Sequence, residues 1–574
     1  MKNSWFKWLP ISTWLPGYTR HDATKDSLAA VIVTLMLIPQ SLAYAMVAGL
    51  PPVTGLYASI LPLIAYTILG TSKTLAVGPV AVVSLMTAES ISPLFEIGSQ
   101  GYISAATTLA FLSGVVLLLM SVLRLGFLTT FLSHPVLSGF MTASGILITI
   151  GQIKHILGVP LHGESVIQRL IELILAIPQA NLPTTLIGVS CLIALIYSRR
   201  SLKPGLIKFG LSPILAGHIT KLAPVLFMIL SIGLVAWFGL DKKGVSVVGQ
   251  IPSGLPGFSL PLLDLELIRE LLPYAILISI IGFVESASVG QTLAAKRRQR
   301  IEPNQELIAL SGANIVSSLN GGFPVTGGLS RSVVNYDAGA ETPLAGTFTA
   351  IGIGITVLYF TPLFTYLPNA VLAATIIVAV SSLIDIKAII HTWKSARSDA
   401  IAMLLTIVGV LAFNVEIGVL AGLFSSLALF LWRTSRPHIA IVGLIEGTHH
   451  FRNIRRFNVL QSKTVLSLRF DESLYFANAR YLEDKIPEYL EQYPQTRHLV
   501  LMLSGVNMVD TSALESLALI HDRLIETNIQ MHLSEVKGPV MDQIDRSDFI
   551  EHFKGKIFLS QFDAINELDS ALIK

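Results

Sequence analysis

Charged side chains are scarce in this sequence. Of its 574 residues, 13% are charged and 52% are hydrophobic, whereas soluble domains carry about 25% charged residues. The shortage lies between Asp26 and Trp432, where apolar segments follow one another, and the sequence after Arg436 has an ordinary soluble composition. Repeated hydrophobic stretches of about 17–25 residues require lipid around them, which excludes a purely soluble protein.

Cysteine is almost absent as well, since Cys191 is the only one. A disulfide framework and a cysteine metal cluster are therefore excluded. The sequence also has no Gly-x-x-x-x-Gly-Lys-[Ser/Thr] loop of an ATPase and no metal-hydrolase or nucleophile motif. We expect no enzyme activity, no cofactor, no metal site and no nucleic-acid partner.

Composition divides the chain into three parts. Residues 1–25 show no signal-peptide cleavage pattern and combine basic residues with tryptophan, which predicts a retained cytoplasmic segment with an amphipathic face. Residues 26–435 form a predicted transmembrane transport domain, and residues 436–574 form a predicted soluble domain in the cytoplasm.

The apolar part contains fourteen candidate membrane spans. Two of them, which begin near Pro79 and near Gly328, are too short to cross about 30 Å of hydrocarbon as straight helices. The spans cover roughly residues 26–46, 54–70, 79–91, 103–123, 134–151, 183–198, 221–240, 268–293, 304–319, 329–338, 343–360, 368–384, 399–413 and 416–433.

Basic residues in the loops predict the orientation, because cytoplasmic loops are enriched in Lys and Arg. With the N-terminus inside, the cytoplasmic loops hold fourteen basic residues and the outer loops hold five. This pattern predicts an α-helical, multi-pass protein of the cell membrane with both termini in the cytoplasm. Each half of seven spans is then inverted relative to the other, and the short span is third in each half, which is typical of inverted-repeat transporters.

Glycine and proline interrupt the chain just before both short spans. The third span opens with Leu75-Ala-Val-Gly-Pro-Val-Ala-Val-Val-Ser84, and the tenth opens with Phe323-Pro-Val-Thr-Gly-Gly-Leu-Ser-Arg-Ser332. A helix that begins within the membrane leaves several N–H groups without partners and carries about half a positive charge at that end. Two such ends that face each other predict a site for a small anion, to which Arg331 adds a full charge. The alternative is that these residues only kink two helices for packing.

Several longer runs carry a family resemblance. They are Pro39-Gln-Ser-Leu-Ala-Tyr-Ala-Met-Val-Ala-Gly-Leu-Pro-Pro-Val-Thr-Gly-Leu-Tyr57, Asn304-Gln-Glu-Leu, Gly312-Ala-Asn and Thr326-Gly-Gly-Leu-Ser-Arg-Ser-Val-Val-Asn-Tyr-Asp-Ala-Gly-Ala340. Together they resemble the SulP family of anion transporters, which includes sulfate permeases and prestin. The resemblance covers nearly the whole chain. It implies a core domain of spans 1–4 and 8–11 that moves against a gate domain of spans 5–7 and 12–14, usually within a homodimer.

The resemblance also implies which residues bind the anion. Matched motif by motif, the family's site falls on five residues: Gln40 and Tyr44 of the first span, Val80 at the third, and Ser330 and Arg331 at the tenth. Gln40 offers an amide donor, and Tyr44 offers an aromatic wall with a hydroxyl group. Without the resemblance, Gln40 and Tyr44 are more often packing residues.

Glu285 is the candidate for ion coupling. It lies inside the eighth span, where an ionised carboxylate is costly unless it is protonated, paired with Arg331 or bound to a cation. A static Glu285–Arg331 ion pair is the structural alternative. Some bacterial members of the family have a coupling glutamate where this chain has Gln40, so the resemblance leaves Glu285 as the coupling residue.

These observations favour secondary active uptake of sulfate with protons by an elevator-type movement. Coupling to sodium, transport of bicarbonate or a dicarboxylate, and passive exchange or conduction are the alternatives within the same class. A membrane-anchored sensor, in which the spans bind an anion without net flux, is a further alternative from another class.

The C-terminal part alternates apolar strands with helical segments, which predicts a sheet covered by helices. Its Asp510-Thr-Ser-Ala-Leu run resembles the strand-to-helix motif of STAS domains. In anti-sigma-factor antagonists of that family, the second hydroxyl residue is phosphorylated, which implies regulatory phosphorylation of Ser512. The alternative is that Asp510, Thr511 and Ser512 only cap a helix.

Overall fold

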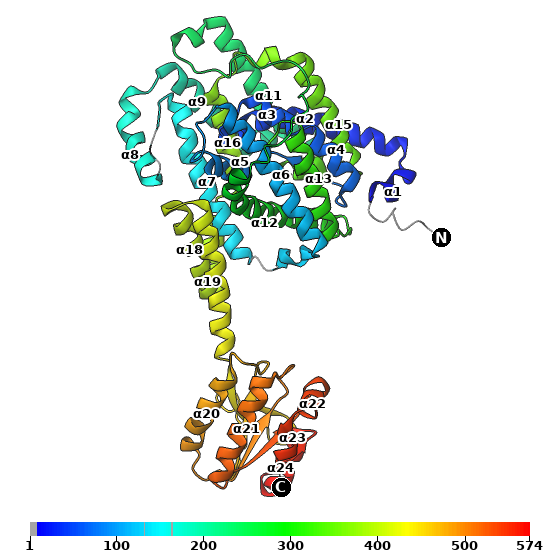
Figure 1. Cartoon of the computed structure of the whole chain (residues 1–574), viewed down its shortest axis with the longest axis vertical. Helices are drawn as coiled ribbons and strands as arrows, with labels where there is room; N and C mark the ends of the chain where they lie inside the picture. Colours follow the sequence, from blue (N-terminus) through cyan, green and yellow to red (C-terminus); the bar gives the residue numbers. More distant parts are fainter. Residues whose placement is uncertain (1–8, 131–132, 162, 164, 574) are drawn as a thin grey trace. The chain divides into compact units, whose positions relative to one another are not determined.

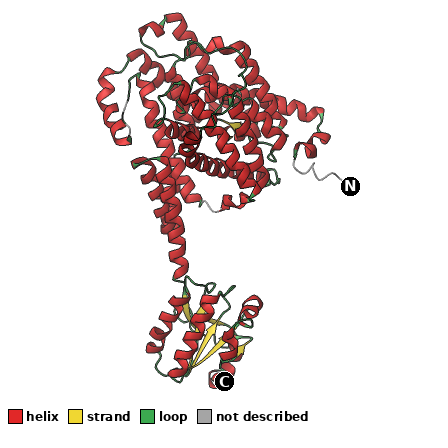
Figure 2. Ribbon diagram, in the orientation of Figure 1, coloured by secondary structure: helices red, strands yellow, loops and turns green. Residues whose placement is uncertain are grey.

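The computed structural model describes residues 9–130, 133–161, 163 and 165–573, which belong to two compact units, Met1–Ser425 and Ser426–Lys574 (Figure 1). The first unit is almost entirely helical, and the second combines helices with a sheet (Figure 2). Each unit is described by itself below.

Every predicted span corresponds to one helix or to two consecutive helices. In the part of the chain that the structure describes, nine helices are long and apolar enough to cross a membrane, and two further apolar helices are shorter. The predicted helical membrane fold is therefore confirmed. The helices of the first half are α2 (Arg20–Val47), α3 (Pro52–Tyr57) with α4 (Leu61–Leu69), α5 (Ala81–Ile91), α6 (Gln100–Val122), α7 (His134–Leu157), α9 (Leu182–Tyr197) and α11 (Pro213–Phe238). Those of the second half are α12 (Leu265–Lys296), α13 (Pro303–Leu319), α14 (Leu329–Asp337), α15 (Leu344–Ile355), α16 (Asn369–Val380), α18 (Arg397–Ala412) and α19 (Val415–Ser435).

Two unpredicted helices occupy matching places in the two halves. Helix α8 (Val166–Ala176) follows the fifth span, and α17 (Ile386–Ser395) follows the twelfth. Each has one apolar face that includes exposed side chains such as Ile174 and Ile390. Such amphipathic helices suit the membrane surface, and their position in each half agrees with the inverted repeat.

The two halves are joined at the breaks that precede the short spans. Strand β1 (Val77–Gly78) lies immediately before α5, and β2 (Thr326–Gly327) lies just before α14. The two strands pair antiparallel, with Val77 opposite Gly327 and Gly78 opposite Thr326. The pairing satisfies backbone groups that lipid cannot satisfy, so both helices can begin inside the unit.

The second unit is a six-stranded sheet in the order β4-β3-β5-β6-β7-β8, flanked by helices. Strands β5 to β8 are parallel, whereas β3 runs antiparallel to both of its neighbours. The predicted α/β fold is confirmed, and two strands, β3 and β4, were not predicted. The elements are β3 (Ile439–Leu444), β4 (Phe451–Asn453), β5 (Val465–Phe470), α20 (Ala479–Gln492), β6 (His498–Met502), α21 (Thr511–Glu526), β7 (Gln530–Ser534), α22 (Gly538–Ile544), α23 (Asp548–His552), β8 (Ile557–Phe558) and α24 (Gln561–Leu568).

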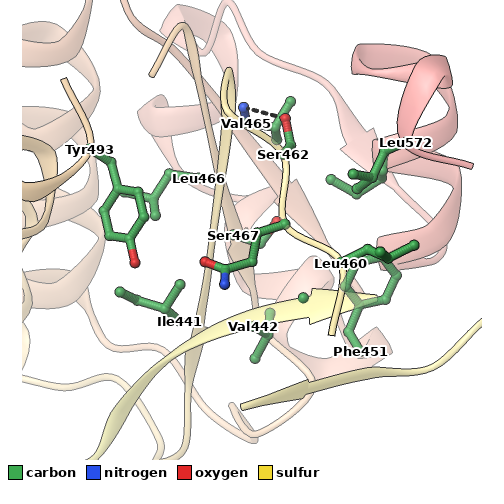
Figure 3. Close-up of a pocket in the computed structure, with 13 residues that line it drawn as sticks. Ile441, Val442, Phe451, Leu460, Ser462, Val465, Leu466, Ser467, Tyr493 and Leu572 are labelled. Atoms are coloured by element: carbon green, nitrogen blue, oxygen red, sulfur yellow. Dashed lines mark hydrogen bonds between the residues drawn. The ribbon is translucent and has the colours of Figure 1, made fainter. Parts of the chain in front are cut away.

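A small cavity lies against β3 and β5 in this unit (Figure 3). Its volume is about 10 Å³, and apolar side chains such as Val442, Phe451 and Leu466 surround it. Ser462 accepts a hydrogen bond of 2.9 Å from the backbone N–H of Val465 at its edge. A space of this size holds at most one water molecule, so it is not a substrate site.

Candidate anion site

The two short helices begin inside the first unit with bare N-termini. Val80 is the N-cap of α5 and Gly328 is the N-cap of α14, and neither position has a side-chain capping bond. The first N–H groups of each helix therefore have no partner within the helix. Because the paired strands β1 and β2 lead directly into α5 and α14, these two positive helix ends lie close together. The predicted interruption of both spans is confirmed.

Arg331 lies in the first turn of α14 and is 2% exposed. Its Nη1 donates a 2.7 Å hydrogen bond to the carbonyl of Pro79, and its Nη2 donates a 3.4 Å bond to the carbonyl of Thr326. Its Nε has no hydrogen-bond partner among the described residues. The guanidinium thus contacts the chain just before α5 and just before α14, and its Nε–H donor has no partner among the described residues.

Glycines lie on both sides of this guanidinium. A Cβ atom at Gly78 would lie 3.1 Å from Nη1 of Arg331, and one at Gly328 would lie 2.9 Å from Nη2. Contacts this short would displace the charged group, because Cβ atoms in proteins keep a greater distance from their neighbours. The glycines that interrupt the spans therefore also make room for the arginine.

All six residues proposed for the anion and for coupling line one cavity of about 440 Å³: Gln40, Tyr44, Val80, Glu285, Ser330 and Arg331. The structure thus brings together residues that lie far apart in the sequence. Gln40, Tyr44, Val80, Glu285 and Arg331 are buried, whereas Ser330 is exposed to the cavity. The volume is ample for a small anion with its water.

Sequence reasoning missed two basic residues of this cavity, Arg199 and Lys221. Nη1 of Arg199 donates a 2.8 Å bond to the carbonyl of Val378, and Lys221 forms an ion pair with Asp337 at 3.6 Å. Both residues were counted only as basic loop residues, and nothing in their sequence surroundings relates them to the short spans.

Glu285 shares the cavity with Arg331 but makes no ion pair with it. No hydrogen bond or ion pair of Glu285 occurs with any residue that the structure describes, so the static Glu285–Arg331 pair is absent from this conformation. The next residue, Ser286, accepts a 2.8 Å bond from the N–H of Gly327, and the Thr326 hydroxyl donates to the carbonyl of Gly282 at 2.7 Å. These bonds fasten α12 to β2 and so fix the distance of Glu285 from the arginine's helix.

Two polar residues of α13 hold the chain that leads into the breaks. Asn314 both donates to the carbonyl of Val325 and accepts from its N–H, each at 2.9 Å, just before β2. Glu306 is fully buried and accepts bonds from the Tyr66 hydroxyl and from the backbone N–H groups of Thr71 and Ser72, ahead of β1. Both residues belong to the short motifs 304–307 and 312–314, which pointed to a family but not to this role.

Comparison with known proteins decides the family. A profile described as Sulfate permease family matches residues 24–406, and one described as STAS domain matches residues 456–564. The chain belongs to the sulfate permease family. It is accordingly a multi-pass membrane protein that transports an anion, and it is not an enzyme.

Relatives match this chain along nearly its whole length. It is 34% identical to "Probable sulfate transporter 4.2" of Arabidopsis thaliana, over 98% of this chain and 84% of the relative. It is 33% identical to "High affinity sulfate transporter 2" of Stylosanthes hamata, over 97% of this chain and 85% of the relative.

Solved structures share its fold. The murine Solute Carrier 26 family member A9 anion transporter in the inward-facing state aligns with a TM-score of 0.90 at 23% identity, over 99% of this chain and 95% of that one. The transmembrane domain of the cyanobacterial bicarbonate transporter BicA aligns with a TM-score of 0.59 at 23% identity, over 71% of this chain and 98% of that one.

In the STAS domain, Asp510 caps α21. Its carboxylate accepts a 2.9 Å bond from the N–H of Ala513 and a 2.8 Å bond from the N–H of Phe476. Ser512 lies in the first turn and is exposed. The capping alternative is thus present in the structure, and phosphorylation of Ser512 stays a prediction.

A buried histidine makes the stability of this domain depend on pH. His532 of β7 is 1% exposed, and its Nδ1 accepts a 3.1 Å bond from the N–H of Lys556. Burial, assisted by the neighbouring His498, lowers the pKa of His532 to about 4. The folded domain therefore keeps this imidazole neutral at pH values where an unfolded chain, with a pKa of about 6.5, takes up a proton.

We expect the domain to keep its full stability above about pH 6.5 and to lose about 3 kcal/mol as the pH falls from there towards 4. Urea unfolding of residues 436–574, expressed alone, measures this change. His532→Gln should flatten the pH dependence, and the same substitution at the exposed His552 should leave it in place. Equal slopes for the native segment and the His532 variant would contradict the assignment.

Proposed function

We propose that this protein takes up sulfate by secondary active transport coupled to protons. The observation that supports this most is the cavity in which the bare N-termini of α5 and α14 and the guanidinium of Arg331 come together. Its donors suit a small tetrahedral dianion, because backbone N–H groups, an arginine and hydroxyl groups bind oxyanions well. The printed names of the plant relatives, which are about one-third identical to this chain, favour sulfate among such anions.

In this proposal five residues hold the anion. Val80 and Ser330 supply backbone N–H groups at the helix ends, Ser330 adds its hydroxyl, and Gln40 and Tyr44 on α2 approach from the side. Arg331 neutralises one of the two negative charges of sulfate, and the positive ends of the two helices offset part of the other. Since the protein encloses the site, each donor is stronger there than it would be in water.

Glu285 is the proposed proton carrier. It lines the same cavity, and the proximity of the cationic site makes its charge state sensitive to the anion. With the anion bound, the additional negative charge favours the protonated carboxyl group, so anion and proton travel together. Sodium at the same carboxylate is the alternative that the experiment below separates.

The transport step is the movement of the core domain against the gate domain. The cavity lies between them, since α2, α5, α12 and α14 line one side and α9, α11 and α16 line the other. Its lining includes Arg199 and Lys221, which belong to the basic residues assigned to the cytoplasm, and this supports an inward-facing conformation with both termini in the cytoplasm. We place residues 1–25 and 436–574 in the cytoplasm, residues 26–435 in the cell membrane, and the chain in a homodimer.

A panel of labelled anions tests the substrate and the coupling. The purified protein in liposomes is given sulfate, bicarbonate or succinate at two pH values, with and without sodium. We expect sulfate to accumulate above its equilibrium level only when the outside is more acidic, and protonophores to abolish this accumulation. Accumulation that follows the sodium gradient, accumulation of another anion instead of sulfate, or only downhill flux would overturn the corresponding part of the proposal.

A further inference from the structure

A second cavity lies at the opposite end of the half-helix α5. Its volume is about 500 Å³, and charged and polar residues of four elements line it. The N-terminus of α5 contributes to the proposed anion site, whereas its C-terminal turn, with Glu89, contributes to the second cavity. The two cavities are therefore separated by the length of one short helix. The second is lined by Met86, Glu89, Ser92, Pro93, Arg169, Tyr274, Leu277, Phe413, Asn414, Val415 and Glu416.

The second cavity also lies on the boundary between the proposed core and gate. Helices α5 and α12 belong to the core spans, whereas α8 and the turn between α18 and α19 belong to the gate spans. By the charge asymmetry of the loops, this end of α5 faces outward. The anion cavity includes residues of the cytoplasmic side, so the second cavity is on the closed side of the site.

One hydrogen bond crosses the boundary here. The carboxylate of Glu89 accepts a bond of 3.4 Å from the backbone N–H of Val415, the first residue of α19. Asn414, the residue before this helix, also caps it, because its side chain accepts a 2.8 Å bond from the N–H of Ile417. A core residue thus completes the N-terminal cap of a gate helix, at the end where the helix dipole attracts an anion.

We propose that Glu89 is a positioning residue that holds the outer side of the core–gate boundary closed by capping α19. This inference rests on the proposed elevator movement. Because Glu89 and the donors at Val80 belong to the same rigid helix, a core that moves the anion site outward must pull Glu89 away from Val415. The bond is long and therefore weak, which allows Glu89 and Val415 to separate during each transport cycle.

The other charged groups around Glu89 agree with this role. Arg169 of α8, Glu416 of α19 and Tyr274 of α12 line the cavity together with Glu89. Arg169 itself donates from Nε to the carbonyl of Gly163 at 2.8 Å, so it is held on the gate side. Glu416 lies on the helix that is being capped and cannot link it to the core.

Glu89→Ala tests the proposal, with Glu416→Ala as the matched control in the same cavity. Two readouts are used in the full-length protein in liposomes. The first is the labelling rate, from the outside, of a cysteine introduced by Met86→Cys, in a background where the only native cysteine is removed by Cys191→Ser. Met86 lines the cavity and is 2% exposed, so it reacts only when the outer side opens. The second is the apparent KM for external sulfate.

We expect Glu89→Ala to raise the labelling rate about threefold, because the loss of a weak hydrogen bond changes an equilibrium by about this factor. The apparent KM for external sulfate should fall by a similar factor, since the outward-facing fraction that binds it has grown. Glu89→Gln keeps an oxygen acceptor and should lie between the native protein and Glu89→Ala. Glu416→Ala should change neither readout.

Unchanged labelling in Glu89→Ala would overturn the proposal. Faster labelling with an unchanged KM would overturn it too, because only the start of α19 would then have loosened. Labelling is measured without any anion. It therefore tests whether Glu89 holds the outer side closed even if the protein transports an anion other than sulfate. Failure of the proposed function would instead appear as absent sulfate uptake in the native protein.

Discussion

Arg331→Ala is expected to abolish anion binding and uptake. The guanidinium supplies a full positive charge in contact with the chain before both helix ends. Truncating a buried, hydrogen-bonded charge commonly costs about 2–5 kcal/mol. We therefore expect sulfate affinity to fall by a factor of about 30 to 4,000. Binding of labelled sulfate to the purified protein, together with uptake into liposomes, measures the loss.

The control for Arg331→Ala is Arg199→Ala. Arg199 lines the same cavity, but its Nη1 bonds to the carbonyl of Val378 on α16 and not to the breaks. Its removal should lower affinity only a few-fold, through weaker long-range attraction. Because Arg331 also holds the carbonyl of Pro79, each variant is first checked for monodisperse elution. Retained sulfate binding in a folded Arg331→Ala variant would refute the assignment of this cavity as the anion site.

Glu285→Gln is expected to separate exchange from accumulation. The amide has nearly the same size as the carboxyl group but cannot take up and release a proton. The anion can still enter and leave the cavity, so sulfate–sulfate exchange should remain within a few-fold of the native rate. Net accumulation driven by a pH gradient should fall to the background level, which is the measured quantity.

Glu266→Gln is the matched control, since it makes the same change at an exposed position of the same helix, α12. It should exchange and accumulate sulfate like the native protein. If Glu285→Gln accumulates sulfate normally, the proton is carried elsewhere. If it loses exchange as well, Glu285 is needed to bind the anion or to hold the site together.

The helices that cross the membrane could be predicted because each is an apolar run bounded by loop residues. Helices α8 and α17 could not be found in this way, since they are short and apolar on one face only. Strand β3 follows the apolar α19 closely and β4 has three residues, so neither leaves a separate periodic signal. After Val465, strands and helices alternate clearly, and this pattern was sufficient to predict the rest of the STAS domain.

The candidate site was predictable in part. Glycine and proline before α5 and α14 indicated the breaks, and the resemblance supplied Gln40 and Tyr44. The pairing of β1 with β2 was not predictable, because two strands of two residues each have no pattern of their own. The positions of Arg199 and Lys221 depend on how the gate helices pack around the cavity, which no local pattern records.

The pairing of β1 with β2 has a consequence for how the protein is made. Pro79 and the arginine that contacts it are 252 residues apart in the chain. While only the first half has left the ribosome, the polar backbone of β1 and the start of α5 lack their partners, and the surrounding hydrocarbon cannot replace them. The first half therefore enters the bilayer incomplete, and the substrate pocket forms only after the second half has been synthesised and inserted beside it.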